Sequence, residues 1–243
     1  MHVSRLWPVV VALVVAAGFG ATQASASHSW GNYHWARTAN PFTVPYGDNL
    51  SSSWDPGLVR ASSDWSRSSV LDSPIVAGGG GNKRCRATNG RIEVCNGNYG
   101  FNGWLGLAQI WTSGSHIVRA TAKMNDSYLS SATYTDTNRQ HVLCQEVGHG
   151  YGLGHQDESG ADLNTCMDYS DALDNPSPNA HDYEQLETIY NSHLDSTSTV
   201  GSAPATSGRV IHRHNGLRSS YIEEDLGHGF RRHTFIFHAI PGF

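Results

Sequence analysis

Residues 145 to 155 read Gln-Glu-Val-Gly-His-Gly-Tyr-Gly-Leu-Gly-His, and this stretch constrains the fold more than any other. Side chains four residues apart on a helix share one side, so Gln145 and His149 can hold one metal ion. Glu146 lies beside them and can take a proton from a water molecule. Gly152 lets the chain leave the helix in a conformation that other residues resist, and His155 then closes a three-ligand site. The fourth position stays open for water and substrate.

A second motif, Cys-Met-Asp-Tyr at residues 166 to 169, follows His155 by eleven residues. Together the two motifs resemble the metzincin clan of secreted zinc peptidases, most closely its small matrixin-like and snapalysin-like members. The clan pattern H-E-x-x-H-x-x-G-x-x-H is matched in this chain at every fixed position except the first, where Gln145 stands. The resemblance is specific over residues 139 to 169, is looser from 42 to 193, and does not cover the tail.

The resemblance implies an α+β fold with a twisted mixed sheet, an active-site helix, a Met-turn and a C-terminal helix. It implies a zinc endopeptidase in which Glu146 is the general base, Met167 forms an apolar floor beneath the zinc, and Tyr169 stabilises the oxyanion. A protein or peptide substrate would add a strand along the sheet edge near Leu105–Trp111. The alternative is a secreted binding protein that keeps the scaffold without turnover.

Gln145 admits three interpretations. Its amide oxygen ligates zinc more weakly than imidazole would, because zinc prefers imidazole or thiolate. Alternatively another side chain replaces the missing imidazole: Tyr169, Asp157 or Glu158, but not His141, which is about 12 Å of helix rise from His149. In the third interpretation the fold persists without catalysis.

Four cysteines in an exported chain favour disulfides, and three pairings are possible. Cys85 and Cys95 flank a segment containing Asn89-Gly90, which predicts a hairpin that brings the two together. Cys144 and Cys166 then remain, and their bridge would clamp the active-site helix to the Met-turn and contribute roughly 3 kcal/mol. Free thiols or a thiolate metal site are the alternative, although the spacing matches no zinc ribbon.

The first 26 residues have the pattern of a secretory signal peptide: Arg5, then an apolar run at Val9–Ala21, then Ala24-Ser25-Ala26. An uncleaved anchor is the alternative, but the run is short for a membrane span. We therefore expect an extracellular monomer without membrane attachment after cleavage. The pattern divides the chain into a signal (1–26), a catalytic domain (27–195), a linker (196–208) and a small β-rich appendage (209–243).

Periodicity predicts strands at 42–45, 71–77, 105–111 and 116–123, and helices at 55–68, 138–151 and 180–193. The first helix has an apolar stripe of Leu58, Val59, Ala61 and Trp65. Three short strands are expected in the appendage, at 209–214, 219–224 and 233–239.

The net charge of −5 and a tail with only five arginines give no reason to expect a nucleic-acid partner. Neither a G-x-S-x-G motif nor a phosphate-binding loop is present. Asp157, Glu158 and Asp162 either hold Ca²⁺ or form a solvated acidic loop. The tail histidines 212, 214, 228, 233 and 238 either bind metal or occupy surface positions.

Latency has no evident source in this pattern. Secreted metzincins of this kind often carry a propeptide that blocks the zinc, but only about fifteen residues separate Ala26 from the first predicted strand. We therefore expect that another residue blocks the site, or that none does.

Overall fold

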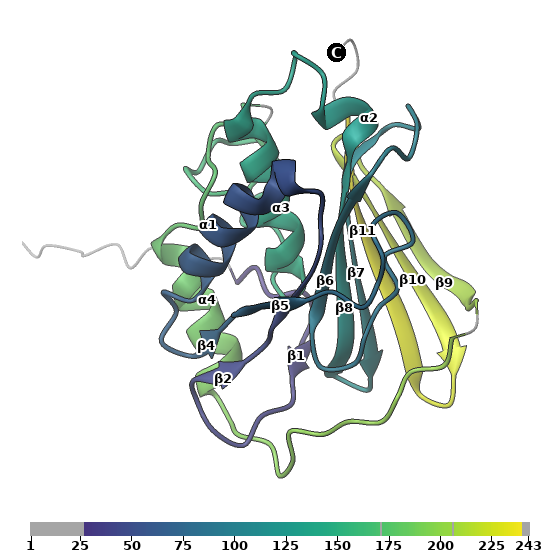
Figure 1. The fold of residues 1–243 in the computed structure, drawn as a ribbon. Helices are drawn as coiled ribbons and strands as arrows, with labels where there is room; N and C mark the ends of the chain where they lie inside the picture. The colour runs from purple at the N-terminus through teal and green to yellow at the C-terminus, as the bar shows by residue number, and fades with distance from the viewer. Residues whose placement is uncertain (1–26, 171, 206, 240–243) are drawn as a thin grey trace, which may run out of the picture.

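The computed structural model describes residues 27–170, 172–205 and 207–239. The predicted signal peptide lies outside them. The described residues form an α+β fold built on one nine-stranded mixed sheet, whose strand order is β5-β3-β6-β8-β7-β11-β10-β9, with β1 added beside β8 (Figure 1). The α+β prediction is confirmed.

The sheet has a parallel half and an antiparallel half. Strands β5, β3, β6 and β8 run parallel, whereas β8, β7, β11, β10 and β9 alternate in direction. A separate parallel pair joins β2 to β4. The strand bounds are β1 (His34–Trp35), β2 (Phe42–Thr43), β3 (Tyr46–Asn49), β4 (Leu71–Asp72), β5 (Ile75–Ala77), β6 (Ile92–Gly97), β7 (Trp104–Ser113), β8 (His116–Asn125), β9 (Arg209–Asn215), β10 (Ser219–Gly227) and β11 (Phe230–His238).

Local sequence signals explain where the main helices begin. Pro56 stands in the first turn of α1, and Thr135 and Asn138 form a reciprocal capping box at the start of α3. Asn179 and Asp182 do the same for α4, which follows two prolines. The helix bounds are η1 (Ser52–Trp54), α1 (Asp55–Trp65), α2 (Asp126–Leu129), α3 (Asp136–His149) and α4 (Ala180–Asn191).

Helices α1, α3 and α4 gather on one side of the sheet (Figure 1), and the main core lies between them and the strands. Trp65 of α1 is fully buried there, and its indole Nε1 donates to the Cys144 carbonyl of α3 at 3.3 Å. Within the part of the chain that the structure describes, every helix is too short or too polar to span a bilayer.

Three local predictions are wrong. Residues 85 to 95 form no hairpin, because β6 pairs in parallel with β3 and β8 and the chain around Cys85 is irregular. The segment 71–77 forms two short strands, β4 and β5, which are separated by residues 73 and 74, the second of which is a proline. Val59 is 60% exposed, although the helical spacing placed it on the apolar stripe of α1.

The three C-terminal strands form as predicted, and they join the main sheet. Strand β11 pairs antiparallel with β7 from Phe230–Ser113 to His238–Trp104. Strand β7 is therefore an interior strand, so the prediction that Leu105–Trp111 offers a free edge to a substrate is wrong.

Residues 192 to 208, as far as they are described, form no helix or strand and run along the surface from α4 to β9 (Figure 1).

Candidate metal centre

The last two turns of α3 carry the polar side chains of the motif into the interior. Gln145, Glu146 and His149 are each at most 1% exposed. Burying three polar groups on one helix is unfavourable unless they bond to something, so this arrangement points to a site that receives a ligand or a proton.

The two motif histidines converge. The Nε2 atoms of His149 and His155 lie 3.1 Å apart, and their rings meet nearly at right angles. The Nδ1 atom of His149 lies 2.8 Å from the Leu153 carbonyl. A carbonyl only accepts, so Nδ1 carries the proton and Nε2 presents its lone pair toward His155.

Burial keeps both imidazoles neutral. It lowers the pKa of His149 to about 4, and it lowers the pKa of His155 well below its ordinary value, with a further contribution from His149. Neutral imidazole is the form that ligates metal.

Gln145 and Glu146, beside these histidines on α3, carry buried oxygens that accept no hydrogen bond from the described residues. The Oε1 atom of Gln145 and both carboxylate oxygens of Glu146 are buried without a hydrogen-bond partner among the described residues. The Gln145 amide nitrogen donates to the Asp168 carbonyl at 2.9 Å, which fixes the amide and leaves its oxygen free. Burial raises the pKa of Glu146 well above its ordinary value.

These donors fit a zinc ion. Zinc–nitrogen bonds of about 2.0–2.1 Å in a tetrahedral site separate two ligand nitrogens by about 3.3 Å, close to the observed spacing. Imidazole suits zinc well, and an amide oxygen is an acceptable but poorer third donor. The buried oxygen of Gln145, which has no other partner among the described residues, is consistent with that role.

Two other motif residues, Gly152 and Met167, pack closely against neighbouring segments of the chain. Gly152 has φ +86°, and a Cβ there would lie 2.1 Å from the Tyr33 carbonyl oxygen. Met167 is fully buried against α3 at Gly148, where a Cβ would lie 2.5 Å from its Sδ. Disulfides join Cys144 to Cys166 and Cys85 to Cys95. The first bridge connects α3 to the turn that contains Met167.

Tyr169 lies beside the motif histidines, with its ring 3.9 Å from that of His155 between centroids. Its hydroxyl hydrogen-bonds the hydroxyl of Ser219, the first residue of β10. Burial raises the pKa of Tyr169 to about 12, so the phenol stays protonated at neutral pH. A protonated phenol can donate a hydrogen bond to a developing negative charge.

The C-terminal strands cover this centre. The ring of Phe235, on β11, stacks on His149 at 4.2 Å with an interplanar angle of 27°, and lies 5.2 Å from His155. Trp30 packs against the same phenyl ring at 4.2 Å. No sequence signal pointed to Phe235 or Trp30, because their contacts with the motif span long stretches of chain.

Other predicted donors are not brought to the centre. Among the described residues, neither Asp157 nor Glu158 joins the two imidazoles in a group of three acidic, histidine or cysteine ligand atoms within 4.8 Å. Asp157 instead accepts from the backbone and hydroxyl of Ser159, and Asp162 accepts from Asn175. Both carboxylates therefore accept hydrogen bonds from nearby parts of the chain.

The histidines outside the motif fall into different environments. His141 is fully buried, and burial lowers its pKa to about 4. His233 was expected either to bind metal or to lie at the surface, and the surface expectation is wrong. It is fully buried on β11, 3.2 Å from the Thr112 hydroxyl and 2.9 Å from the Tyr221 hydroxyl. A second cluster, which the sequence did not predict, contains His34, His193 and Asp195.

Comparisons with known proteins add little to this picture. No protein-family model and no curated protein matches the chain. Two solved structures are similar in part. Myroilysin is 13% identical over 68% of this chain and 99% of its own, with a TM-score of 0.41. High choriolytic enzyme 1, a hatching-enzyme zinc protease from Oryzias latipes (medaka), is 11% identical over 65% and 94%, with a TM-score of 0.38.

Proposed function

We propose that this protein is a secreted zinc-dependent endopeptidase of the metzincin clan, of the matrixin-like or snapalysin-like type. One observation carries the proposal: two imidazole Nε2 atoms converge to 3.1 Å beside a buried glutamate whose carboxylate has no partner among the described residues. Two neighbouring histidines without further motif residues would more often be an ordinary hydrogen-bonded pair than metal ligands. The adjacent glutamate, the glycine hinge and the Met-turn favour a metal centre.

In this proposal His149, His155 and Gln145 hold the ion. Zinc, when bound, supplies Lewis-acid polarisation of a carbonyl and lowers the pKa of a water molecule. The weak amide donor at Gln145 lowers the affinity for zinc relative to a third imidazole.

Two other side chains handle the proton and the developing charge. Glu146 accepts the proton of the attacking water at its carboxylate and passes it to the leaving amine, a task for which a raised pKa is suited. Tyr169 donates its hydroxyl proton as a hydrogen bond to the oxyanion of the substrate. In the described structure that hydroxyl is bonded to Ser219, so this step needs the two to separate.

The proposed location is extracellular, and the proposed assembly is a monomer that acts on proteins or peptides. Two disulfides fit an oxidising compartment. The signal-like pattern of residues 1–26 would direct export, with residues 27–195 as the catalytic domain, whose sheet β9 to β11 extend.

A non-catalytic binding protein is the second candidate. The observation that favours it is the cover over the centre: Phe235 lies on His149, and β11 fills the position beside β7 where a substrate strand would pair. In that case zinc held by the motif residues would be structural, and binding would involve other surfaces.

The test combines metal analysis with a cleavage assay on fluorescent casein. We expect the zinc-loaded wild type to cleave slowly, Glu146→Ala to abolish cleavage while keeping the metal, and Gln145→His to bind zinc at least tenfold more tightly, with activity held or raised. Gln140→His, a matched change on the same helix, should leave both unchanged. Zinc binding without cleavage in the wild type and in Gln145→His would reject the peptidase. No gain of affinity in Gln145→His would reject Gln145 as a ligand.

A further inference from the structure

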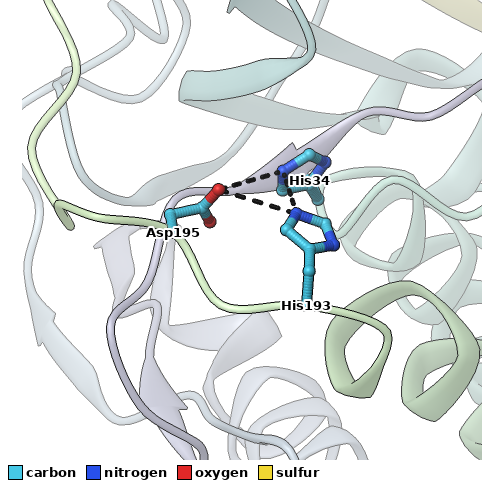
Figure 2. A group of neighbouring side chains, drawn as sticks. All are labelled: His34, His193 and Asp195. Atoms are coloured by element: carbon cyan, nitrogen blue, oxygen red, sulfur yellow. Dashed lines mark hydrogen bonds and ion pairs between the residues drawn. The ribbon is translucent and has the colours of Figure 1, made fainter.

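A second group of metal-type donors lies where β1 meets the chain that follows α4. His34 is on β1, and His193 and Asp195 follow α4; Figure 2 shows the three side chains turned toward one another. They are distant in sequence, and only the fold brings them together.

The spacing of the donor atoms resembles that around a single ion. The Nε2 atoms of His34 and His193 lie 3.2 Å apart. The Oδ1 atom of Asp195 lies 3.5 Å from the His193 Nε2 and 3.8 Å from the His34 Nε2. Two ligands of one tetrahedral zinc ion are separated by about 3.3 Å, so small adjustments suffice to bind one.

His34 Nδ1 and Asp195 Oδ2, the atoms that do not belong to the cluster, already have hydrogen-bond partners. The His34 Nδ1 lies 2.8 Å from the Asn32 carbonyl, so it carries the proton and Nε2 presents a lone pair. Arg37 donates to Asp195 Oδ2 from its backbone at 3.1 Å and its guanidinium at 3.0 Å, which leaves Oδ1 facing the imidazoles. Orienting partners of this kind accompany metal-bound histidines and carboxylates.

A fourth donor is adjacent. The His116 Nε2 lies 3.0 Å from Asp195 Oδ1, and His116 is the direct neighbour of His34 in the β1–β8 pairing. Solvent reaches the cluster through a cavity of about 490 Å³ that His34 and His193 help to line. The His193 side chain is 46% exposed, so an ion has an entry path.

We propose that His34, His193 and Asp195, with His116 as a candidate fourth ligand, bind a divalent cation of the zinc type. Nitrogen ligands from two or three imidazoles with one carboxylate oxygen favour zinc over calcium or magnesium. The ion would fasten β1 to the chain that follows α4. The ring centroids of Trp30 and His149 lie 6.0 Å apart. Because Trp30 is four residues before His34, an ion bound by His34 would also restrict the movement of Trp30 beside the motif histidines.

Metal stoichiometry and thermal unfolding of the full chain test this proposal. We expect wild type to bind two zinc ions and His193→Ala one, with the zinc-dependent rise in melting temperature reduced by roughly 5 °C. His193 is half exposed, so its removal should not unfold the protein, which circular dichroism verifies. His212→Ala, on the exposed strand β9, is the control and should keep both ions.

The variant His149→Ala/His155→Ala separates the two sites. It should keep one ion and lose it only when His193→Ala is added. Wild type that binds no more than one ion, of an affinity unchanged by His193→Ala, would overturn the second site and leave a hydrogen-bonded cluster of histidines around Asp195.

A different observation carries a second inference, which rests on the proposed peptidase function. Strand β11 occupies the full length of β7 on the side where an extended substrate would pair. Gly106 of β7 lies against the Glu146 carboxylate, since a Cβ there would be 2.2 Å from Oε1. A peptide on this edge would therefore lie next to Glu146, and β11 takes that place.

The covering strands contribute few buried apolar side chains to the main core, against which Tyr221 and Phe235 pack only partly buried. Of the residues of β9 to β11, Phe237 alone is a buried member of the main hydrophobic cluster, and every residue of β9 is exposed. The connection through residues 192 to 208 has no helix or strand in its described part. Elements with few buried apolar contacts open at lower free energy than the core does.

We infer that β10 and β11 form an intramolecular plug that keeps the peptidase latent, and that substrate enters when β11 leaves β7. The plug acts through Phe235 over the histidines and through Ser219 on the Tyr169 hydroxyl.

A reversible lock tests the plug in the full chain. Gln109 and Thr234 face each other directly across β7 and β11, with their side chains 3.1 Å apart, so cysteines at both positions can form a bridge. We expect the oxidised Gln109→Cys/Thr234→Cys variant to cleave fluorescent casein at least tenfold more slowly than after mild reduction. Wild type and Gln109→Cys alone, treated in the same way, are the controls.

Phe235→Ala opens the cover without a lock and should raise cleavage several-fold. Equal cleavage in the locked and reduced forms would overturn the plug and leave the peptidase standing. Absence of cleavage in every zinc-loaded form, Phe235→Ala and Gln145→His included, would overturn the peptidase itself, and the plug as its regulator with it.

Discussion

Gly152 links the stability of this protein to its candidate metal centre, and its replacement gives a prediction with a calculable size. The residue has φ +86°, and a Cβ there would lie 2.1 Å from the Tyr33 carbonyl oxygen. The left-handed conformation costs an alanine about 1–2 kcal/mol, and relieving a backbone clash costs about 1–3 kcal/mol more. We therefore expect Gly152→Ala to lower the free energy of unfolding by about 3 kcal/mol.

The clash should also be felt at the metal. Gly152 donates its N–H to the His149 carbonyl at 3.0 Å and accepts from the Trp30 N–H at 2.6 Å, so a shift at this position moves both the helix end and the wall of the site. Zinc affinity should fall at least tenfold, because ligand geometry that is off by a fraction of an ångström weakens a metal site.

Urea denaturation of the metal-free protein measures the first effect, and competition with a chromogenic chelator measures the second. Gly103→Ala is the matched control, since Gly103 has φ +90° but no atom lies within 4 Å of the position that its Cβ would take. It should cost only the roughly 1–2 kcal/mol of the backbone conformation, with unchanged zinc affinity. A Gly152→Ala variant no less stable than Gly103→Ala, with full zinc affinity, would refute the reasoning.

Two further predictions concern pH and the disulfides. Burial, with a contribution from Arg231, lowers the pKa of His233 to about 3. Below the unfolded value near 6.5 this histidine binds its proton only in the unfolded chain, so it lowers stability by up to about 1.4 kcal/mol per pH unit, in addition to the contributions of His141, His149 and His155. His233→Gln should remove its share of that dependence in urea titrations at about pH 7.5 and 5.5. Replacing Cys144 and Cys166 by serine should remove about 3 kcal/mol and weaken zinc binding, whereas the same change at Cys85 and Cys95 should cost a similar amount in calorimetry and leave zinc affinity intact.

The elements near the motif could be read from the sequence because their signals are local. The spacing of Gln145 and His149 on one helix and the glycine just beyond its end each act within a few residues. The prediction failed where a local signal competes with long-range pairing. Asn89-Gly90 makes a turn, but β6 pairs with β3 and β8 instead of folding back on Cys85.

The candidate metal centre likewise has a part that the sequence predicts and a part that depends on long-range pairing. Which side chains meet on α3 follows from helical periodicity, whereas Phe235 and Ser219 reach the centre only through the pairing of β11 with β7. Nothing in the pattern of the tail distinguishes a strand that joins the main sheet from one that forms a separate unit, because both alternate with the same period of two.

The sequence by itself determined which side chains of the motif share one side of α3, Gln145 and His149, since the spacing along a helix fixes which groups face one way. Tertiary structure alone decided that β11 lies over those donors and that His34, His193 and Asp195 come together. The physical reason is that contacts between distant segments depend on how strands register and layers pack, and these are set by the free energy of the whole fold.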